Sequence, residues 1–134
     1  TKYDIGVDLE WSCRSNIIDT IAEKKFSSAE FNYLKASPRT EQRRIFFSLW
    51  TLKESYIKAI GKGLLEPLDS FAIDLDSLKI SFLRKQDYRD SSSWSFALFN
   101  PTEDHLCALC VAHPNNAPGD IKYQHIYWHD LDTQ

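Results

Sequence analysis

The 134-residue sequence contains no methionine, has only four glycines and shows no excess of basic residues. Its 19 acidic residues outnumber its 16 lysines and arginines, so the formal net charge of −3 does not indicate binding to nucleic acid or to an anionic membrane. No apolar run approaches the ~20 residues needed to span a bilayer, and no signal-peptide pattern opens the sequence. We therefore expect a cytoplasmic protein whose partners include neither nucleic acid nor a membrane.

The lack of methionine includes the first position, where Thr1 is followed almost directly by a strand pattern. The simplest interpretation is a processed or cut chain, and we expect a fragment of a longer protein. A chain of this length suffices for one domain, but it buries a smaller share of its surface than a larger domain does. A missing partner or a missing second half is therefore physically reasonable.

Cysteine is scarce, and the three residues Cys13, Cys107 and Cys110 cannot all pair with one another. Cys107 and Cys110 form a C-x-x-C pattern inside the apolar run 106–111. On a strand, positions three residues apart point to opposite faces. We interpret both as buried thiols that behave as small hydrophobic side chains, rather than as a metal or redox pair.

The first candidate site lies in residues 3–10, where apolar and other residues alternate with the period of two that is typical of a strand. This alternation places Asp8 and Glu10 on one face of the strand. Taken alone, the pair is most simply a solvated polar face. Two neighbouring like charges repel, however, unless a cation lies between them. Mg²⁺ is one such cation, since it takes one or two carboxylates together with water and substrate phosphate.

Helical spacing of apolar residues predicts three helices, over residues 16–24, 27–37 and 38–60. Ser27 and Glu30 form a capping-box pattern at the start of the second helix. For the third helix we expect Ser37 as the N-cap and Pro38 at the first helical position. Gly61 is the predicted C-terminal stop.

Beyond Gly63 the period changes from 3.6 to two, which predicts strands over 71–75, 78–83, 94–99, 106–112 and 123–128. Turn signals separate them, among them Asn100-Pro101. Helices that come early and strands that come late predict one α+β domain over residues 1–134, with the helices packed on a mainly antiparallel sheet.

The second candidate site lies in residues 50–58 of the third predicted helix, where Glu54 and Lys58 are i, i+4 neighbours. On spacing alone this pair is most simply a surface ion pair worth a few tenths of a kcal/mol. Together with Lys53 and the two strand carboxylates, the pair supplies what transfer of a phosphate ester requires. Those requirements are a metal site, cations that face phosphate, and a candidate base.

The two candidate sites match known motifs. Residues 5–10 resemble the G-x-D-x-E strand of the 4′-phosphopantetheinyl transferase superfamily, and residues 50–58 resemble its W-x-x-K-E-[SA]-x-x-K helix. Residues 61–64 and 67–71 resemble the G-K-G-L and P-L-D-S-F segments of the Sfp type. The resemblance extends from about residue 4 to residue 114. It implies that the chain forms one half of the transferase fold and corresponds to the C-terminal half of a two-half Sfp-type enzyme.

The resemblance also implies an activity, namely the transfer of 4′-phosphopantetheine from coenzyme A to a serine of an acyl or peptidyl carrier protein (holo-[acyl-carrier-protein] synthase activity). It implies that Asp8, Glu10 and Glu54 ligate Mg²⁺, with Mn²⁺ as the alternative, and that Asp8 thereby belongs to the coenzyme A site. Glu54 is the implied base for the carrier serine, directly or through a metal-bound water. Lys53 and Lys58 are implied to contact the phosphates, and Lys58 to steady the phosphate under attack.

Sfp-type enzymes consist of two similar halves with the active site between them, so the resemblance implies that a missing N-terminal half or a second subunit completes the site. Activity of this chain alone stays an open question. A basic surface offers a candidate docking site for an acidic carrier protein, with a solvated helix surface as the simpler alternative. Its residues are Lys24, Lys25, Lys35, Arg39, Arg43 and Arg44.

Two other functions stay open on sequence alone. The first is a non-catalytic half-domain that binds a carrier protein or a partner subunit; the retained acid and lysine pattern argues against it. The second is an unrelated Mg²⁺-dependent phosphotransferase or phosphatase that uses the same carboxylates. No glycine-rich phosphate loop of the G-x-x-x-x-G-K-[ST] kind supports this second alternative.

Overall fold

The structure is a computed structural model that describes residues 4–13, 18–61, 66–84 and 90–113. Its strands and helices follow one another as β1 (Ile5–Trp11), α1 (Ile18–Lys25), α2 (Ser28–Ala36), α3 (Arg39–Ile60), β2 (Phe71–Asp74), β3 (Lys79–Phe82), β4 (Trp94–Thr102) and β5 (His105–Ala112). Short 3₁₀ turns occupy Leu68–Ser70 and Ser91–Ser93. The predicted strand over 123–128 lies outside the described residues.

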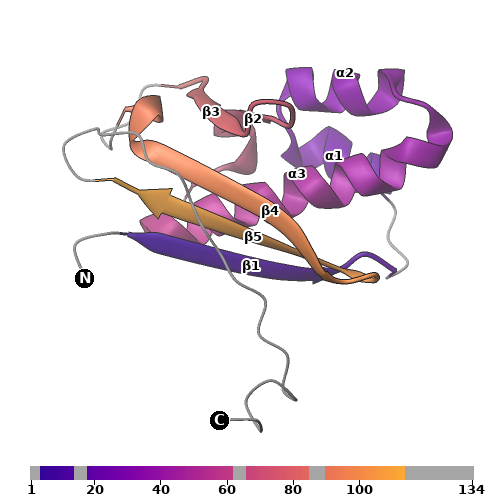
Figure 1. The fold of residues 1–134 in the computed structure, drawn as a ribbon. Coiled ribbons are helices and arrows are strands. Elements are labelled where there is room, and N and C mark those ends of the chain that lie inside the picture. Colours follow the sequence, from indigo (N-terminus) through magenta and orange to yellow (C-terminus); the bar gives the residue numbers. More distant parts are fainter. Residues whose placement is uncertain (1–3, 14–17, 62–65, 85–89, 114–134) are drawn as a thin grey trace, which may run out of the picture.

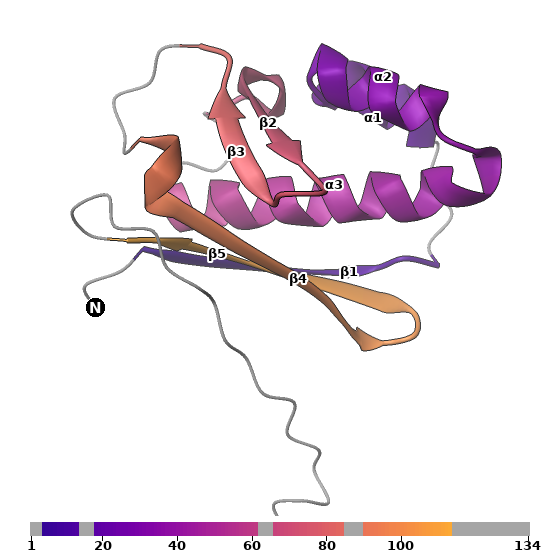
Figure 2. The ribbon, with the colours of Figure 1, turned by 45° about the horizontal axis from the view of Figure 1, so that its top comes forward.

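The long helix α3 lies between two layers (Figure 1). On one side is an antiparallel sheet with the strand order β1-β5-β4. On the other side are α1, α2 and the antiparallel pair β2-β3, which Figure 2 shows above the helix. Helices packed on antiparallel strands confirm the predicted α+β class.

Burial of α3 explains why it organises the core. Tyr56 is fully buried, and its ring centroid lies 4.6 Å from that of Phe71 and 5.0 Å from that of Trp94. Nearer the start of the helix, Phe46 stacks on Phe26 at 5.5 Å, which anchors the end of α1. Each fully buried aromatic of this kind contributes roughly 1.5–3 kcal/mol through removal of apolar surface from water.

Two of the three predicted helix boundaries are confirmed. The side chain of Ser27 accepts a hydrogen bond from the backbone N–H of Glu30, while the Glu30 carboxylate accepts one from the backbone of Ser27, which completes the capping box. At the far end of α3, Gly61 adopts φ 70° and its N–H donates to the carbonyl of Ile57. This left-handed conformation costs glycine nothing, since it has no Cβ.

The predicted start of α3 is wrong by one residue. The helix begins at Arg39, with Pro38 at the cap position and Ser37 outside it. The hydroxyl of Ser37 instead donates to the carbonyl of Tyr33 at 2.7 Å, at the end of α2. The Ser37 side chain therefore caps the end of α2, and not the start of α3 as the sequence spacing predicts.

Strand β4 also differs from its prediction. Instead of ending before Asn100-Pro101, it continues to Thr102, with a shift of register between Phe99 and Thr102. Proline lacks a backbone N–H and is tolerated in a sheet at bulges or edges. Pro101, which the sequence predicts to be part of a turn, therefore lies at a bulge within β4.

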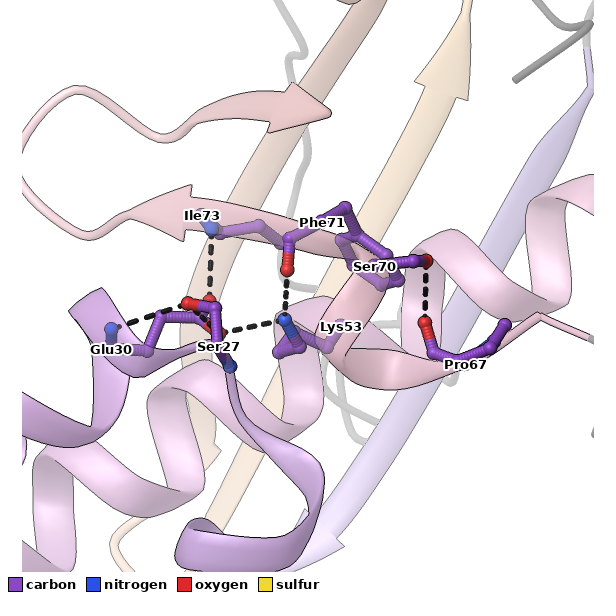
Figure 3. Close-up of polar contacts among 7 residues, drawn as sticks. All are labelled: Ser27, Glu30, Lys53, Pro67, Ser70, Phe71 and Ile73. Carbon is purple, nitrogen blue, oxygen red and sulfur yellow. Dashed lines mark hydrogen bonds and ion pairs between the residues drawn. The ribbon is translucent and has the colours of Figure 1, made fainter. Parts of the chain in front are cut away.

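Figure 3 shows a buried polar network that joins α2, α3 and β2. The ammonium of Lys53, which is fully buried, donates to the Glu30 carboxylate at 2.7 Å and to the carbonyl of Phe71 at 2.6 Å. The other carboxylate oxygen of Glu30 accepts the N–H of Ile73 at 2.9 Å. Burial lowers the pKa of Lys53, and the adjacent Glu30 charge opposes that shift.

This network concerns the phosphate contact implied for Lys53, which stays a prediction. Lys53 has no exposed surface, and its ammonium is held inside the core by Glu30 and the Phe71 carbonyl. The physical reason is Glu30, whose carboxylate compensates the buried lysine with an opposite charge.

Strand β1 approaches α3 closely at Gly6. A Cβ atom at this position would lie 1.9 Å from the carbonyl oxygen of Ser55 and 2.5 Å from the backbone nitrogen of Ala59. Both contacts are with helix backbone, which cannot move aside as a flexible side chain can. Only glycine therefore allows β1 to lie this close to the second half of α3, where Glu54 and Lys58 are found.

Gly6→Ala should separate β1 from α3. We expect the free energy of unfolding to fall by about 3 kcal/mol or more, at the upper end of the range for overpacking, because backbone must shift on both sides. Urea denaturation followed by circular dichroism measures this loss. Gly61→Ala is the contrast, since no atom crowds that position and the left-handed conformation alone costs about 1–2 kcal/mol. Equal small losses in both variants would contradict the close approach.

Removal of one partner from the Glu30–Lys53 pair should be more damaging than removal of both charges. We expect Lys53→Met to destabilise the protein by about 3–5 kcal/mol, because it leaves a buried carboxylate without its cation. The double variant Glu30→Gln, Lys53→Met should recover part of that loss. A double-mutant cycle of unfolding free energies tests this, and additive losses would show that the pair is not coupled.

Candidate functional site

Strand β1 carries its acids inward and its apolar side chains outward. Asp8 is buried against α3 and Glu10 is partly buried, whereas the alternating apolar residues of the strand are exposed. This reverses the usual arrangement, in which the polar face of an edge strand meets water. The shared face that sequence alternation predicts for Asp8 and Glu10 is therefore directed at the helix.

The nearest cation to Asp8 is Lys58. The Lys58 ammonium donates to Oδ1 of Asp8 at 2.6 Å, and the carboxylate side chain is 5% exposed while the lysine side chain is 52% exposed. This hydrogen bond is the first cause of a raised pKa for Lys58, so the ammonium form is favoured. Oδ2 of Asp8 is buried and has no hydrogen-bond partner among the described residues.

Glu54 lies on the same side of α3, one turn before Lys58. Burial raises the pKa of Glu54, and the negative charge of Asp8 raises it further. The ammonium groups of Lys58 and Lys25 act in the opposite direction. The Glu54 carboxylate is therefore a stronger base than an ordinary glutamate, which is the property that general base catalysis requires.

Glu10 is held by Trp50. The indole Nε1–H of Trp50 donates to Oε1 of Glu10 at 3.1 Å, while the ring stacks on Phe46 with centroids 6.1 Å apart. The tryptophan of the helix motif thus packs in the core and also positions a strand carboxylate. Glu10 still contributes to the raised pKa of Lys58, so its charge acts on the same site.

The structure therefore brings four of the five implied site residues, Asp8, Glu10, Glu54 and Lys58, into one charged group, and places Lys53 elsewhere. Within the described ranges, no three or more acidic, histidine or cysteine side chains are arranged so that they could hold a metal ion as they stand. The buried, unpartnered Oδ2 of Asp8 nevertheless fits a hard cation, which prefers carboxylate oxygen.

A cavity of about 430 Å³ opens beside this group. Its lining includes Lys25 from α1, Glu54 and Lys58 from α3, and Pro67 and Leu68 from the segment after the helix. The volume falls within the roughly 300–1,000 Å³ that is usual for small-molecule sites. Sequence reasoning missed Lys25 as a residue of this cavity, because no periodicity relates α1 to α3.

The two cysteines of the C-x-x-C pattern are free thiols. Cys110 is buried and Cys107 is partly buried, and burial raises the pKa of both. Thiols with raised pKa values are poor nucleophiles and poor metal ligands at neutral pH. Their arrangement agrees with the hydrophobic role that the sequence predicts.

Several members of the basic surface expected to meet a carrier protein have partners of their own. Arg44 pairs with Glu41 at 2.8 Å and Lys35 pairs with Asp19 at 3.3 Å. Docking of a carrier on this surface stays a prediction. No helix in the described ranges is both long and apolar enough to cross a membrane.

The sequence resembles bacterial enzymes of one family along most of its length. It is 35% identical over 111 residues to 4′-phosphopantetheinyl transferase gsp of Aneurinibacillus migulanus, a match that covers 82% of this chain and 44% of the relative. It is also 35% identical over 117 residues to 4′-phosphopantetheinyl transferase Sfp of Bacillus subtilis (strain 168), covering 87% of this chain and 50% of the relative. The chain thus spans about half the length of these relatives.

Solved structures show the same fold at lower identity. The holo-(acyl-carrier-protein) synthase of Bacillus anthracis str. Ames, solved in complex with CoA (3′,5′-ADP), aligns with a TM-score of 0.65 at 18% identity, covering 81% of this chain and 94% of that one. The Thermotoga maritima holo-[acyl-carrier-protein] synthase aligns with a TM-score of 0.63 at 19% identity, covering 82% and 62%.

A family model also matches most of the chain. It is described as the 4′-phosphopantetheinyl transferase superfamily, and it covers residues 4–110, which contain both the β1 acids and the α3 motif. The sequence relatives, the shared fold and this model agree with one another. The chain belongs to the 4′-phosphopantetheinyl transferase superfamily.

Proposed function

We propose that the protein that contains this chain transfers 4′-phosphopantetheine from coenzyme A to a serine of an acyl or peptidyl carrier protein, in a Mg²⁺-dependent reaction. The observation that carries the proposal is the contact between buried Asp8 and Lys58, beside Glu54 and at the edge of a cavity. Membership of the superfamily and relatives named as 4′-phosphopantetheinyl transferases support it.

The proposed reaction replaces one phosphate ester with another. The serine oxygen attacks the β-phosphate of coenzyme A and forms a new P–O bond, the P–O bond to the other phosphate of the diphosphate breaks, and 3′,5′-adenosine diphosphate leaves. Negative charge is redistributed over the phosphate oxygens and the leaving group. Fixed cations stabilise this charge without reorganisation of water, so their placement accounts for most of the catalysis.

The chain's own residues divide the work. Glu54 accepts the proton of the serine hydroxyl, for which its raised pKa suits it. Lys58 is exposed at the cavity and keeps its positive charge, so its ammonium can contact the phosphate under attack. Asp8, Glu10 and Glu54 would hold Mg²⁺, and the ion would supply positive charge to the diphosphate.

We further propose that a second unit of the same fold, supplied by the rest of a longer protein or by a second copy, covers the outer face of β1. Four apolar side chains are about half exposed on that face: Ile5 at 53%, Val7 at 48%, Leu9 at 57% and Trp11 at 51%. A contiguous apolar stripe of this kind marks an interface. The relatives, which are about twice as long, have room for such a unit.

Glu54→Gln tests the proposed activity. We expect transfer to fall by about 10²–10⁴-fold, since the amide neither accepts the serine proton nor ligates the metal with a charge. Mass spectrometry of an apo carrier protein, incubated with the full-length protein, coenzyme A and Mg²⁺, measures the modified fraction. Glu103→Gln, in the exposed β4–β5 turn, is the control and should leave transfer within about twofold.

Near-normal transfer by Glu54→Gln would remove Glu54 from its role. If the wild-type protein binds coenzyme A and the carrier protein but transfers no phosphopantetheine, the non-catalytic half-domain is the better explanation.

Ile5→Lys tests whether the outer face of β1 is covered. In the full-length protein we expect a loss of at least about 2 kcal/mol in unfolding free energy, because a covered lysine would lose its hydration without an opposite charge. Guanidinium denaturation measures this loss, and light scattering distinguishes a second copy from a unit in the same chain. Leu83→Lys is the matched control, since Leu83 is 56% exposed and lies beyond the β2-β3 pair, away from this face. A loss of only about 0.5 kcal/mol in both variants would indicate that water meets this face.

A further inference from the structure

The cavity beside Glu54 contains a lysine to which the proposed reaction assigns no role. Lys25 is the last residue of α1, and it lines this cavity together with Glu54 and Lys58 of α3. A second helix therefore contributes a positive charge to the same cavity. The two motifs of the sequence contain no signal for it.

The backbone that carries Lys25 is held firmly. The next residue, Phe26, is buried against Phe46, and its N–H donates to the carbonyl of Ala22 at 2.9 Å. Ser27 then begins the capping box of α2. These contacts fix the position from which the Lys25 side chain extends, so its place in the cavity follows from core packing.

The ammonium of Lys25 differs from those of Lys53 and Lys58. Lys53 is occupied by Glu30 in the core, and Lys58 donates to Asp8. Among the described residues, Lys25 has no hydrogen bond and no ion pair, and it is exposed. It is close enough to Glu54 to lower the pKa of that carboxyl. Lys25 is therefore a cavity lysine that remains available to a ligand.

The charge of the proposed ligand makes a second lysine useful. A diphosphate carries negative charge on both phosphates, whereas Lys58 offers a single ammonium that also neutralises Asp8. Charge-assisted hydrogen bonds from more than one side hold such an anion more firmly and orient it. Lys25, which lines the same cavity from another helix, supplies the second contact.

We propose that Lys25 is a further substrate-binding residue, whose ammonium contacts the diphosphate of the nucleotide co-substrate in this cavity. The proposal rests on the proposed function, because the diphosphate is that of coenzyme A. It assigns Lys25 to the nucleotide and removes it from the basic surface that the sequence suggests for carrier docking.

Calorimetric titration of the full-length protein with coenzyme A, in the presence of Mg²⁺ and without carrier, tests this assignment. We expect Lys25→Gln to weaken binding by about fivefold to tenfold, the range for loss of a partly exposed charge-assisted contact. Lys25→Arg should retain most of the affinity, and Lys25→Glu should lose more than the glutamine variant. Lys24→Gln is the matched control, since Lys24 is the adjacent exposed lysine but does not line the cavity, and its affinity for coenzyme A should be unchanged.

Dephospho-coenzyme A, which lacks the 3′-phosphate but keeps the diphosphate, identifies the phosphate that Lys25 contacts. The same fold-loss for both ligands supports the diphosphate. A loss seen only with coenzyme A would place Lys25 at the 3′-phosphate and overturn the assignment.

The remaining outcomes separate this proposal from the proposed function. Equal affinities of the wild type and Lys25→Gln for coenzyme A overturn the role of Lys25 and leave the proposed function intact. If Lys25→Gln leaves the affinity for coenzyme A unchanged but raises the KM for the carrier protein, Lys25 contacts the carrier instead of the diphosphate, and the proposal is overturned. If the wild type binds neither ligand, both this proposal and the proposed function fail.

Discussion

The close packing of β1 on α3 is the constraint on which the candidate site depends. Gly6 has no Cβ, so the strand backbone lies against the helix backbone at Ser55 and Ala59. That approach brings Asp8, two residues farther along the strand, within hydrogen-bond distance of Lys58. The G-x-D pattern of β1 thus has a physical explanation. The glycine allows a short distance between strand and helix, and at that distance the aspartate can accept a hydrogen bond from Lys58. A larger residue at position 6 would separate the strand acid from the helix cation.

The two lysines of the helix motif serve different ends. Lys53 is buried and links α3 to α2 and β2 through its hydrogen bonds to Glu30 and the Phe71 carbonyl. Lys58 is half exposed and faces the strand acids. Positions 53 and 58 are five residues apart, which is about 500° of rotation on an α-helix, so the two side chains leave the helix in different directions. One motif therefore supplies both a buried ion pair to the helix layer and a half-exposed cation to the candidate site.

The exposed apolar face of β1 and the greater length of the relatives both suggest a further unit beside this sheet. The inward acids leave apolar side chains facing outward on β1, an arrangement that suits a surface covered by another unit. The cavity beside Glu54 is open, and among the described residues its cations come from α1 and α3. A further unit next to the sheet would bury the stripe, and it offers a route by which additional side chains could reach a bound nucleotide.

Much of this protein follows from the sequence by itself. Periodicity determined the strands and helices to within two residues over the described ranges, except that β4 ends three residues later than predicted. The Ser27 capping box and the Gly61 stop followed from local backbone chemistry, and the spaced motifs identified the superfamily. Only the tertiary structure decided that Glu30 and Lys53 pair in the core, that Lys25 lines the cavity, and that Asp8 and Glu10 point inward. The reason is that local hydrogen bonds and side-chain periodicity depend on neighbours along the chain. Whether a charge meets water, a buried opposite charge or a cavity depends on elements that are distant in sequence and that only packing brings together.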